Sequence, residues 1–151
     1  MKWLWIVAVI VALAFALTAC GGGDGGDGEE AKSDYPVQTV STENWDMSLT
    51  NHEISDSDTE EGKKVITFYF TFENTSDREL IYGDTVNAHF KQADANLWIY
   101  DSKEPKDPIA AGESKDVEIA FTLNDEETPV DISIGGYTSS VAREDITVDI
   151  K

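Results

Sequence analysis

The sequence predicts an all-β fold, an antiparallel β-sandwich of about seven or eight strands. Apolar and polar residues alternate in several short stretches after residue 35. Segments rich in Asn, Asp, Ser, Gly and Pro, which favour turns, separate these stretches. No stretch of ten or more residues shows the apolar spacing of an amphipathic helix, so helices should be minor. Alternation also favours antiparallel pairing, because strands of parallel sheets read as continuous apolar runs.

Each predicted strand has its own pattern. The stretch "VITFYFTFE" (65–73) places four large apolar side chains on one face, which indicates a central strand. The other alternating stretches are "WDMSLT" (45–50), "DVEIAFTL" (116–123), "VDISI" (130–134) and "ITVDI" (146–150), with shorter candidates at "ELIY" (79–82), "VNAHF" (86–90) and "NLWIY" (96–100). We expect Trp98, or alternatively Trp45, to be the large aromatic side chain that fills the core.

The amino-terminal segment "MKWLWIVAVIVALAFALTA" (1–19) has one early positive charge, then an uncharged and mostly apolar run that ends in small residues. A cleaved secretory signal and a retained membrane anchor are two interpretations. A third is a lipoprotein signal, because Leu17-Thr18-Ala19-Cys20 resembles the bacterial lipobox. That resemblance implies cleavage before Cys20 and a thioether-linked diacylglycerol on its sulfur. We favour this third interpretation.

The predicted organisation has three parts: a lipoprotein signal peptide (1–19), a lipidated Cys20 with a flexible tether (20–34) and one folded domain (35–151). Cys20 is the only cysteine, so the domain has no internal disulfide. The tether "GGGDGGDGEEAKSD" is rich in glycine and spans roughly 20 Å as a flexible coil. The predicted location is the extracytoplasmic face of the cell membrane.

The composition is strongly acidic, with a net charge of −19. Such a chain repels nucleic acid, whose binding depends on Lys and Arg, and repels anionic lipid in the same way. The charge is typical of adaptation to concentrated salt, where screening is strong. A competing interpretation is an acidic surface for a cationic partner. Adaptation to salt predicts a melting temperature that rises as sodium chloride approaches molar concentration; an unchanged or falling value would contradict it.

Two segments carry a family resemblance. "FTFENTSDREL" (70–80) ends a strand with an Asn-x-Ser turn, and "PIAAGESKDVEIAFTL" (108–123) leads through Gly-Glu-Ser into another strand. Over residues 62–135 this order resembles uncharacterised immunoglobulin-like domains on lipoproteins of Gram-positive bacteria. The layout is also similar to immunoglobulin-like proteinase inhibitors of the subtilisin-inhibiting type. Either resemblance implies an immunoglobulin-like β-sandwich, and the family one implies no known catalytic residues.

Candidate chemistry is sparse. His52 and His89 are the only histidines; we expect His89 to be an exposed strand residue, and His52 with Met47 is a weak copper candidate. A weak calcium candidate is the acidic stretch Asp56, Asp58, Glu60 and Glu61, although it lacks the glycine and glutamate positions of the helix-loop-helix calcium loop. We expect no enzyme activity and no cofactor.

The functional expectation is a membrane-anchored, non-enzymatic binding module. It reaches the membrane through the lipid on Cys20 and docks to another cell-envelope protein or a wall component. One alternative is a proteinase inhibitor that presents the loop "DSKEPKDPIAAG" (101–112), stiffened by Pro105 and Pro108. A weaker alternative is a domain that senses calcium or a small ligand.

Overall fold

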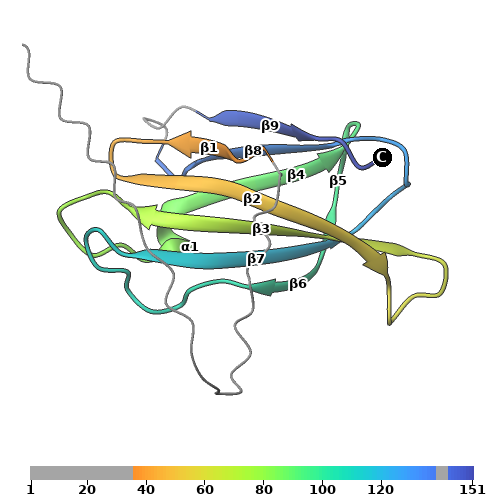
Figure 1. Ribbon diagram of the computed structural model, residues 1–151, viewed down its shortest axis with the longest axis horizontal. Helices are drawn as coiled ribbons and strands as arrows, with labels where there is room; N and C mark the ends of the chain where they lie inside the picture. Colours follow the sequence, from red (N-terminus) through yellow and green to blue (C-terminus); the bar gives the residue numbers. More distant parts are fainter. Residues whose placement is uncertain (1–35, 139–142) are drawn as a thin grey trace, which may run out of the picture. The chain divides into compact units, whose positions relative to one another are not determined.

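The structure, a computed structural model, describes residues 36–138 and 143–151 and contains two antiparallel β-sheets (Figure 1). The five-stranded sheet has the order β1 (Gln38–Ser41), β2 (Trp45–Asp56), β3 (Lys64–Asn74), β7 (Ser114–Thr122) and β6 (Trp98–Lys103). The four-stranded sheet has the order β5 (Ala95–Asn96), β4 (Val86–Gln92), β8 (Val130–Gly136) and β9 (Glu144–Val148). One short helix, α1 (Tyr82–Thr85), precedes β4.

These elements confirm the predicted all-β antiparallel sandwich. The described residues form nine strands rather than seven or eight. The two that the alternation pattern missed are short: β1 has four residues and β5 has two. The stretch "ELIY" is not a strand, because Leu80 makes only an isolated bridge to Ile109 and α1 begins at Tyr82.

The predicted segment 1–19, Cys20 and the tether to residue 34 lie outside the described residues. Within residues 36–138 and 143–151, no helix is long and apolar enough to cross a membrane.

The core lies between the inner faces of the two sheets. Strand β3 is central in its sheet, as predicted, and its inward side chains Ile66, Phe68, Phe70 and Phe72 are at most 1% exposed. Phe90 from β4 meets Phe121 from β7 with ring centroids 4.3 Å apart, which joins the two sheets. Aromatic pairs at such distances add stabilisation beyond that of the buried area.

The large aromatic residue at one end of this core is Trp45, which is 2% exposed and stacks against Phe72 at 6.1 Å. The expectation for Trp98 was wrong, because its side chain is 80% exposed. Trp98 begins the edge strand β6 opposite Thr122 of β7, so it has a neighbouring strand on one side only. An edge position of this kind leaves a large side chain uncovered.

Two buried amide side chains stabilise the loops of the sandwich through hydrogen bonds to the backbone. Asn74 donates to the carbonyl oxygens of Arg78 (2.7 Å) and Ile109 (2.8 Å) and accepts from the backbone N–H and hydroxyl of Ser76 (3.0 and 2.7 Å). The Asn74 backbone also bonds both Gly112 and Glu113. The two segments that carry the family resemblance therefore contact each other, and their motifs are structural.

Gln92 has the corresponding role in the connection between β7 and β8. Its amide nitrogen donates to the carbonyl oxygens of Asp125 (3.0 Å) and Thr128 (2.8 Å). Its oxygen accepts from the backbone N–H groups of Asn124 (2.7 Å) and Asp125 (3.3 Å). Burial of an amide is tolerated when its donors and acceptor are satisfied in this way.

Candidate functional site

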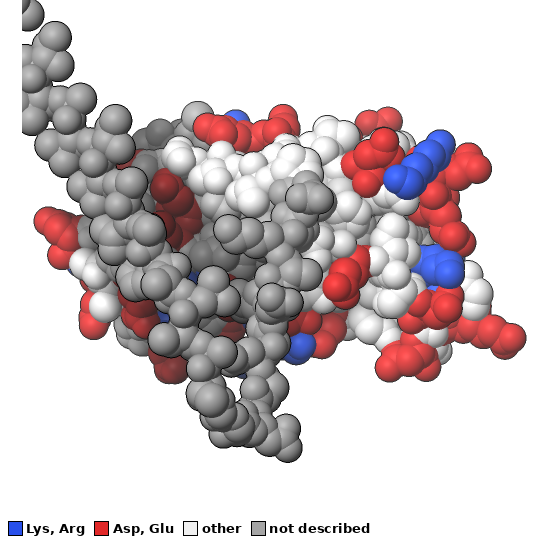
Figure 2. All heavy atoms as spheres, in the orientation of Figure 1, with Lys and Arg blue, Asp and Glu red and all other residues white. Residues whose placement is uncertain are grey.

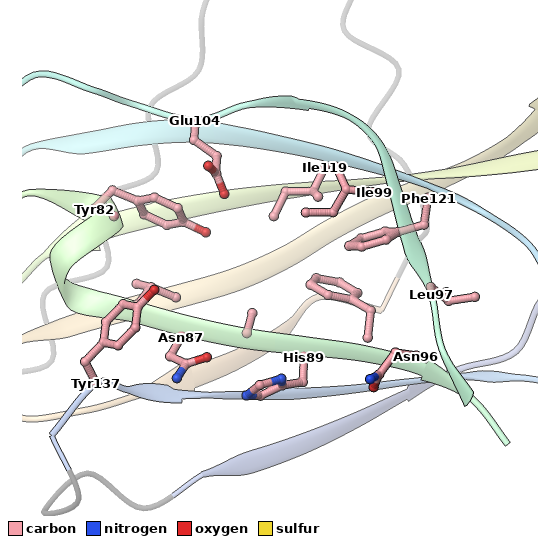
Figure 3. A pocket seen from close by; sticks show the side chains of 14 residues that line it. Tyr82, Asn87, His89, Asn96, Leu97, Ile99, Glu104, Ile119, Phe121 and Tyr137 are labelled. Carbon is pink, nitrogen blue, oxygen red and sulfur yellow. The ribbon is translucent and has the colours of Figure 1, made fainter. Parts of the chain in front are cut away.

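The sandwich has a groove on the side where β6 and β4 lie at or near the edges of the two sheets. We call it the β4–β6 groove; its volume is about 390 Å³ (Figure 3). Its apolar wall comes mainly from Ile99 of β6 and from Ile119 and Phe121 of β7, and polar side chains of β4 and β5 lie opposite. A concave surface that combines apolar walls with a few converging polar groups is the usual form of a binding site.

One end of the groove is formed by Tyr82, Glu104 and Tyr137, which we call the Tyr–Glu corner. Figure 3 shows the Glu104 carboxylate and both tyrosine side chains at the same end of the groove. Tyr82 is only 3% exposed, and its ring packs edge-on against Phe72 with centroids 5.5 Å apart. This packing holds the Tyr82 side chain in place.

The oxygens of the Tyr–Glu corner are available for a ligand. Among the described residues, the Tyr82 hydroxyl has no hydrogen-bond partner and reaches the solvent of the groove, and Glu104 forms no ion pair. Burial raises the pKa of Tyr82, and the nearby Glu104 charge raises it further. Tyr82 therefore stays protonated at neutral pH, when its hydroxyl can both donate and accept.

The β4 backbone adds a second kind of binding group. Strand β5 pairs only with Lys91 and Gln92, and the Leu97 N–H then donates to the Phe90 carbonyl at 2.9 Å. Because backbone groups of successive strand residues point to opposite sides, the Ala88 N–H and C=O point to this same edge. Within residues 36–138 and 143–151 no strand pairs with the edge beside Ala88, so this edge can pair with a strand of a partner, a known mode of peptide recognition.

Exposed apolar side chains continue the groove onto the surface. Ile99 is 67% exposed and Tyr137 is 62% exposed, and both line the groove. A register shift between Ile99 and Asp101 marks a bulge in β6. Bulges and charges on edge strands limit unwanted pairing, so β4 is the better edge for a partner strand.

The structure does not assemble the calcium candidate. Asp56 ends β2 and is paired with Lys64, whose ammonium nitrogen lies 2.7 Å from the carboxylate oxygen. Asp58, Glu60 and Glu61 are exposed in the hairpin that leads to β3. In the part of the chain that the structure describes, no group of three or more His, Cys, Asp or Glu side chains is placed to hold a metal ion.

The copper candidate is wrong for a geometric reason. Met47 pairs with Phe72 in the fully buried core, whereas His52 pairs with Phe68 beyond a register shift in β2. These partners are four positions apart on β3, which places the two side chains about 13 Å apart along the strand. His52 is half-buried beside Phe68, and this burial lowers its pKa. His89 is exposed on β4, as predicted, at the rim of the groove.

The loop suggested for proteinase inhibition, residues 101–112, is held against the domain by burial and hydrogen bonding of Ile109 in its second half. Ile109 is fully buried and exchanges two backbone hydrogen bonds with Leu80, at 2.8 and 3.0 Å. Pro105 is half-buried and Pro108 is exposed. The freely presented part is therefore limited to the few residues before Ile109, and nothing in this geometry favours the inhibitor alternative.

Acidic side chains are spread over the surface. On the face shown in Figure 2, Asp and Glu lie at both ends and along the edges, with few Lys or Arg between them. The described residues contain three ion pairs, and all are on the surface. Most carboxylates in this part therefore have no cationic partner. The salt dependence proposed above stays a prediction.

Comparison with known proteins identifies a family. The family model described as a domain of unknown function, DUF5067, matches residues 26–135. The chain belongs to this family. The DUF5067 match includes the Asn74 turn and the groove strands β4 and β6, and it ends at residue 135 within β8. No curated protein matches the chain.

Solved structures similar to this DUF5067 chain support the fold. A functionally unknown protein from Listeria monocytogenes has 14% identity and a TM-score of 0.51, covering 76% of this chain and 82% of its own. A conserved hypothetical protein from Bacillus anthracis has 11% identity and a TM-score of 0.51, with 76% and 92% coverage. An uncharacterised β-sandwich protein from Clostridium difficile has 18% identity and a TM-score of 0.50, with 73% and 89% coverage. At these identities the likeness concerns the fold alone.

Sequence reasoning missed the Tyr–Glu corner. Its three residues lie in separate segments: Tyr82 begins α1, Glu104 follows β6 and Tyr137 follows β8. Each is a common residue in an acidic chain with five tyrosines. The one available signal was Tyr82 in "ELIY", which we expected to belong to a strand.

Proposed function

We propose that this protein is a membrane-anchored extracytoplasmic lipoprotein whose sandwich domain binds a cell-envelope partner through the β4–β6 groove. The observation that carries the binding role is the Tyr–Glu corner, where the hydroxyl of the largely buried Tyr82 has no partner among the described residues, reaches the solvent of the groove and lies at the same end as the Glu104 carboxylate. Polar groups that converge on a concave, largely apolar surface are the groups that orient a ligand in a binding site.

The anchor is supported by the sequence. An apolar leader, the lipobox-like Leu17-Thr18-Ala19-Cys20 and a glycine-rich polar segment follow one another without interruption. Two acyl chains on one cysteine satisfy the requirement for stable membrane attachment. The tether then lets the groove reach a partner at the membrane surface.

A binding role without catalysis fits the groove. His89 is the only histidine that lines it, and the lining contains no Ser, Thr or Cys that could act as a nucleophile beside it. Edge strands and aromatic side chains at the groove suit recognition of another protein. We therefore place the partner among envelope proteins rather than substrates.

The binding role is tested by photo-crosslinking in intact bacteria that carry the full chain. A crosslinking amino acid replaces Ile99 in the groove or, as a control, Thr59 in the β2–β3 hairpin, which is also exposed and does not line the groove. We expect one protein adduct from position 99, weakened by a second substitution, Tyr137→Ala, and absent from position 59. Equal adducts from both positions, or none from position 99, would contradict the proposal.

The anchor is tested by metabolic labelling with an alkyne-bearing fatty acid. Wild-type protein should incorporate the label and fractionate with membranes, whereas Cys20→Ser should do neither. Unlabelled wild-type protein, or label retained by Cys20→Ser, would show that Cys20 is not the attachment point.

A further inference from the structure

We propose that the occupant of the β4–β6 groove is an extended peptide segment that carries a lysine or arginine. Its cationic side chain enters the Tyr–Glu corner, and its backbone pairs with the open edge of β4. The inference rests on the function proposed above and adds the chemistry of the partner.

The charge of the groove selects a cation. Among the residues that line it, Glu104 is the only carboxylate, and neither Lys nor Arg is present. Glu104 has no ion-pair partner among the described residues, and the whole chain carries a charge of −19. An anionic occupant would be repelled, whereas a cationic one gains both the local pairing and the long-range attraction.

The Tyr–Glu corner suits a cation with several N–H donors. The Glu104 carboxylate accepts hydrogen bonds, and the Tyr82 and Tyr137 hydroxyl oxygens can accept them as well. A lysine ammonium or arginine guanidinium offers donors to all three groups, and hydrogen bonds between charged groups are the strong ones. The tyrosine rings contribute a further attraction where a cation approaches their faces.

The open edge of β4 selects an extended backbone. Residues 86–89 precede the part of β4 that β5 covers, and four extended residues span about 13 Å. The Val86 N–H already bonds the Tyr82 carbonyl, which leaves the Ala88 N–H and C=O as the central pairing groups. The apolar wall of Ile99, Ile119 and Phe121 can then receive alternate side chains of the added strand.

A second copy of this chain is a poorer occupant. Two copies would each bring a charge of −19 to the interface, and the like charges disfavour association. The edge of β6 also offers a bulged strand rather than a regular one. A basic segment of a different protein has neither disadvantage.

The test uses the full chain in detergent micelles and a library of blocked heptapeptides. The peptides alternate threonine and valine and carry lysine, arginine, norleucine or glutamate at the centre. We expect lysine and arginine peptides to be retained at least roughly tenfold better than norleucine peptides, because a hydrogen bond to a charged group contributes enough for that ratio. Equal retention of lysine, norleucine and glutamate peptides would overturn the inference.

Matched variants locate the effect. Glu104→Gln removes the groove charge, and Glu60→Gln removes an equal charge from the β2–β3 hairpin. We expect the preference for basic peptides to disappear in Glu104→Gln and to persist in Glu60→Gln. An equal reduction in both variants would show a general charge effect and would overturn the inference.

Backbone pairing is tested on the peptide, so that the fold is undisturbed. N-methylation of alternate peptide bonds in one register removes the donors to β4 and should abolish retention, whereas methylation in the other register should not. If methylation lowers peptide retention in neither register, the peptide backbone does not pair with β4, and the strand-pairing part of the inference is wrong. If the peptide library, the Glu104→Gln comparison and the N-methylated peptides all fail while position 99 still crosslinks to a protein in cells, the proposed function stands. The partner then has a different chemistry.

Discussion

Asn74 and Tyr82 are two buried polar residues on the same stretch of chain, and they differ in how their polar groups are satisfied. Asn74 is fully buried, and its amide makes four hydrogen bonds within the chain. Tyr82 is almost as buried, yet its hydroxyl has no partner among the described residues and lines the groove. The first residue stabilises the fold, and the second leaves a binding group available. The comparison separates residues that hold the domain together from those that serve a partner.

The largest effect should come from Asn74→Ala. It leaves the carbonyls of Arg78 and Ile109 without their donor and the Ser76 N–H without its acceptor. The hydrogen bonds that are lost are all at least partly buried. We expect a loss of about 3 kcal/mol in the free energy of unfolding, measured by urea denaturation. Asn124→Ala, at an exposed position, is the control and should change it by less than about 0.5 kcal/mol. Equal losses of stability in Asn74→Ala and Asn124→Ala would contradict the role of Asn74 in stabilising the fold.

The next effect should come from Gln92→Ala, which releases the connection between β7 and β8. We expect a loss of about 2 kcal/mol, smaller than for Asn74 because its partners lie closer to solvent. Hydrogen exchange should show faster exchange of the Asn124 and Asp125 amides than of the β3 amides. If Gln92→Ala lowers the free energy of unfolding more than Asn74→Ala does, Gln92 and not Asn74 makes the larger contribution to stability.

A smaller effect concerns pH. Backbone N–H groups of Thr128 and Glu127 donate to the Asp125 carboxylate and lower its pKa below the usual 3.8. Since the folded pKa is lowered, the ionised group stabilises the fold above the unfolded pKa, and this contribution is lost as pH falls through the folded pKa. The stability difference between wild type and Asp125→Ala should therefore be present at pH 6 and shrink below about pH 3.8. A constant difference would contradict this.

The smallest effect should be that of Tyr82→Phe on stability. It removes a hydroxyl that has no partner in the described chain and keeps the ring on Phe72, so the free energy of unfolding should change by less than about 0.5 kcal/mol. Retention of basic peptides should nevertheless fall several-fold. A large loss of stability with unchanged peptide retention would place Tyr82 with Asn74, among the residues that hold the fold.

Much of the fold could be predicted because strand alternation is local. The pattern in "VITFYFTFE" identified β3 and its inward face, and Ile66, Phe68, Phe70 and Phe72 are indeed buried. The pattern failed where the neighbouring strand decided the outcome. Trp45 and Trp98 both begin alternating stretches, but only Trp45 lies within the sandwich, because β6 is an edge strand. The register shift in β2 likewise places His52 opposite Phe68, which no local pattern indicated.

The sequence by itself determined the strand-rich fold, the acidic character and the lipobox-like segment that predicts an anchor at Cys20. These depend on residues close together in the chain, where periodicity and short motifs are readable. The tertiary structure alone decided the β4–β6 groove. Its Tyr–Glu corner joins residues 82, 104 and 137, and its open edge exists because β5 covers only the end of β4. Both features depend on which strands become neighbours, and long-range pairing in the folded chain decides that.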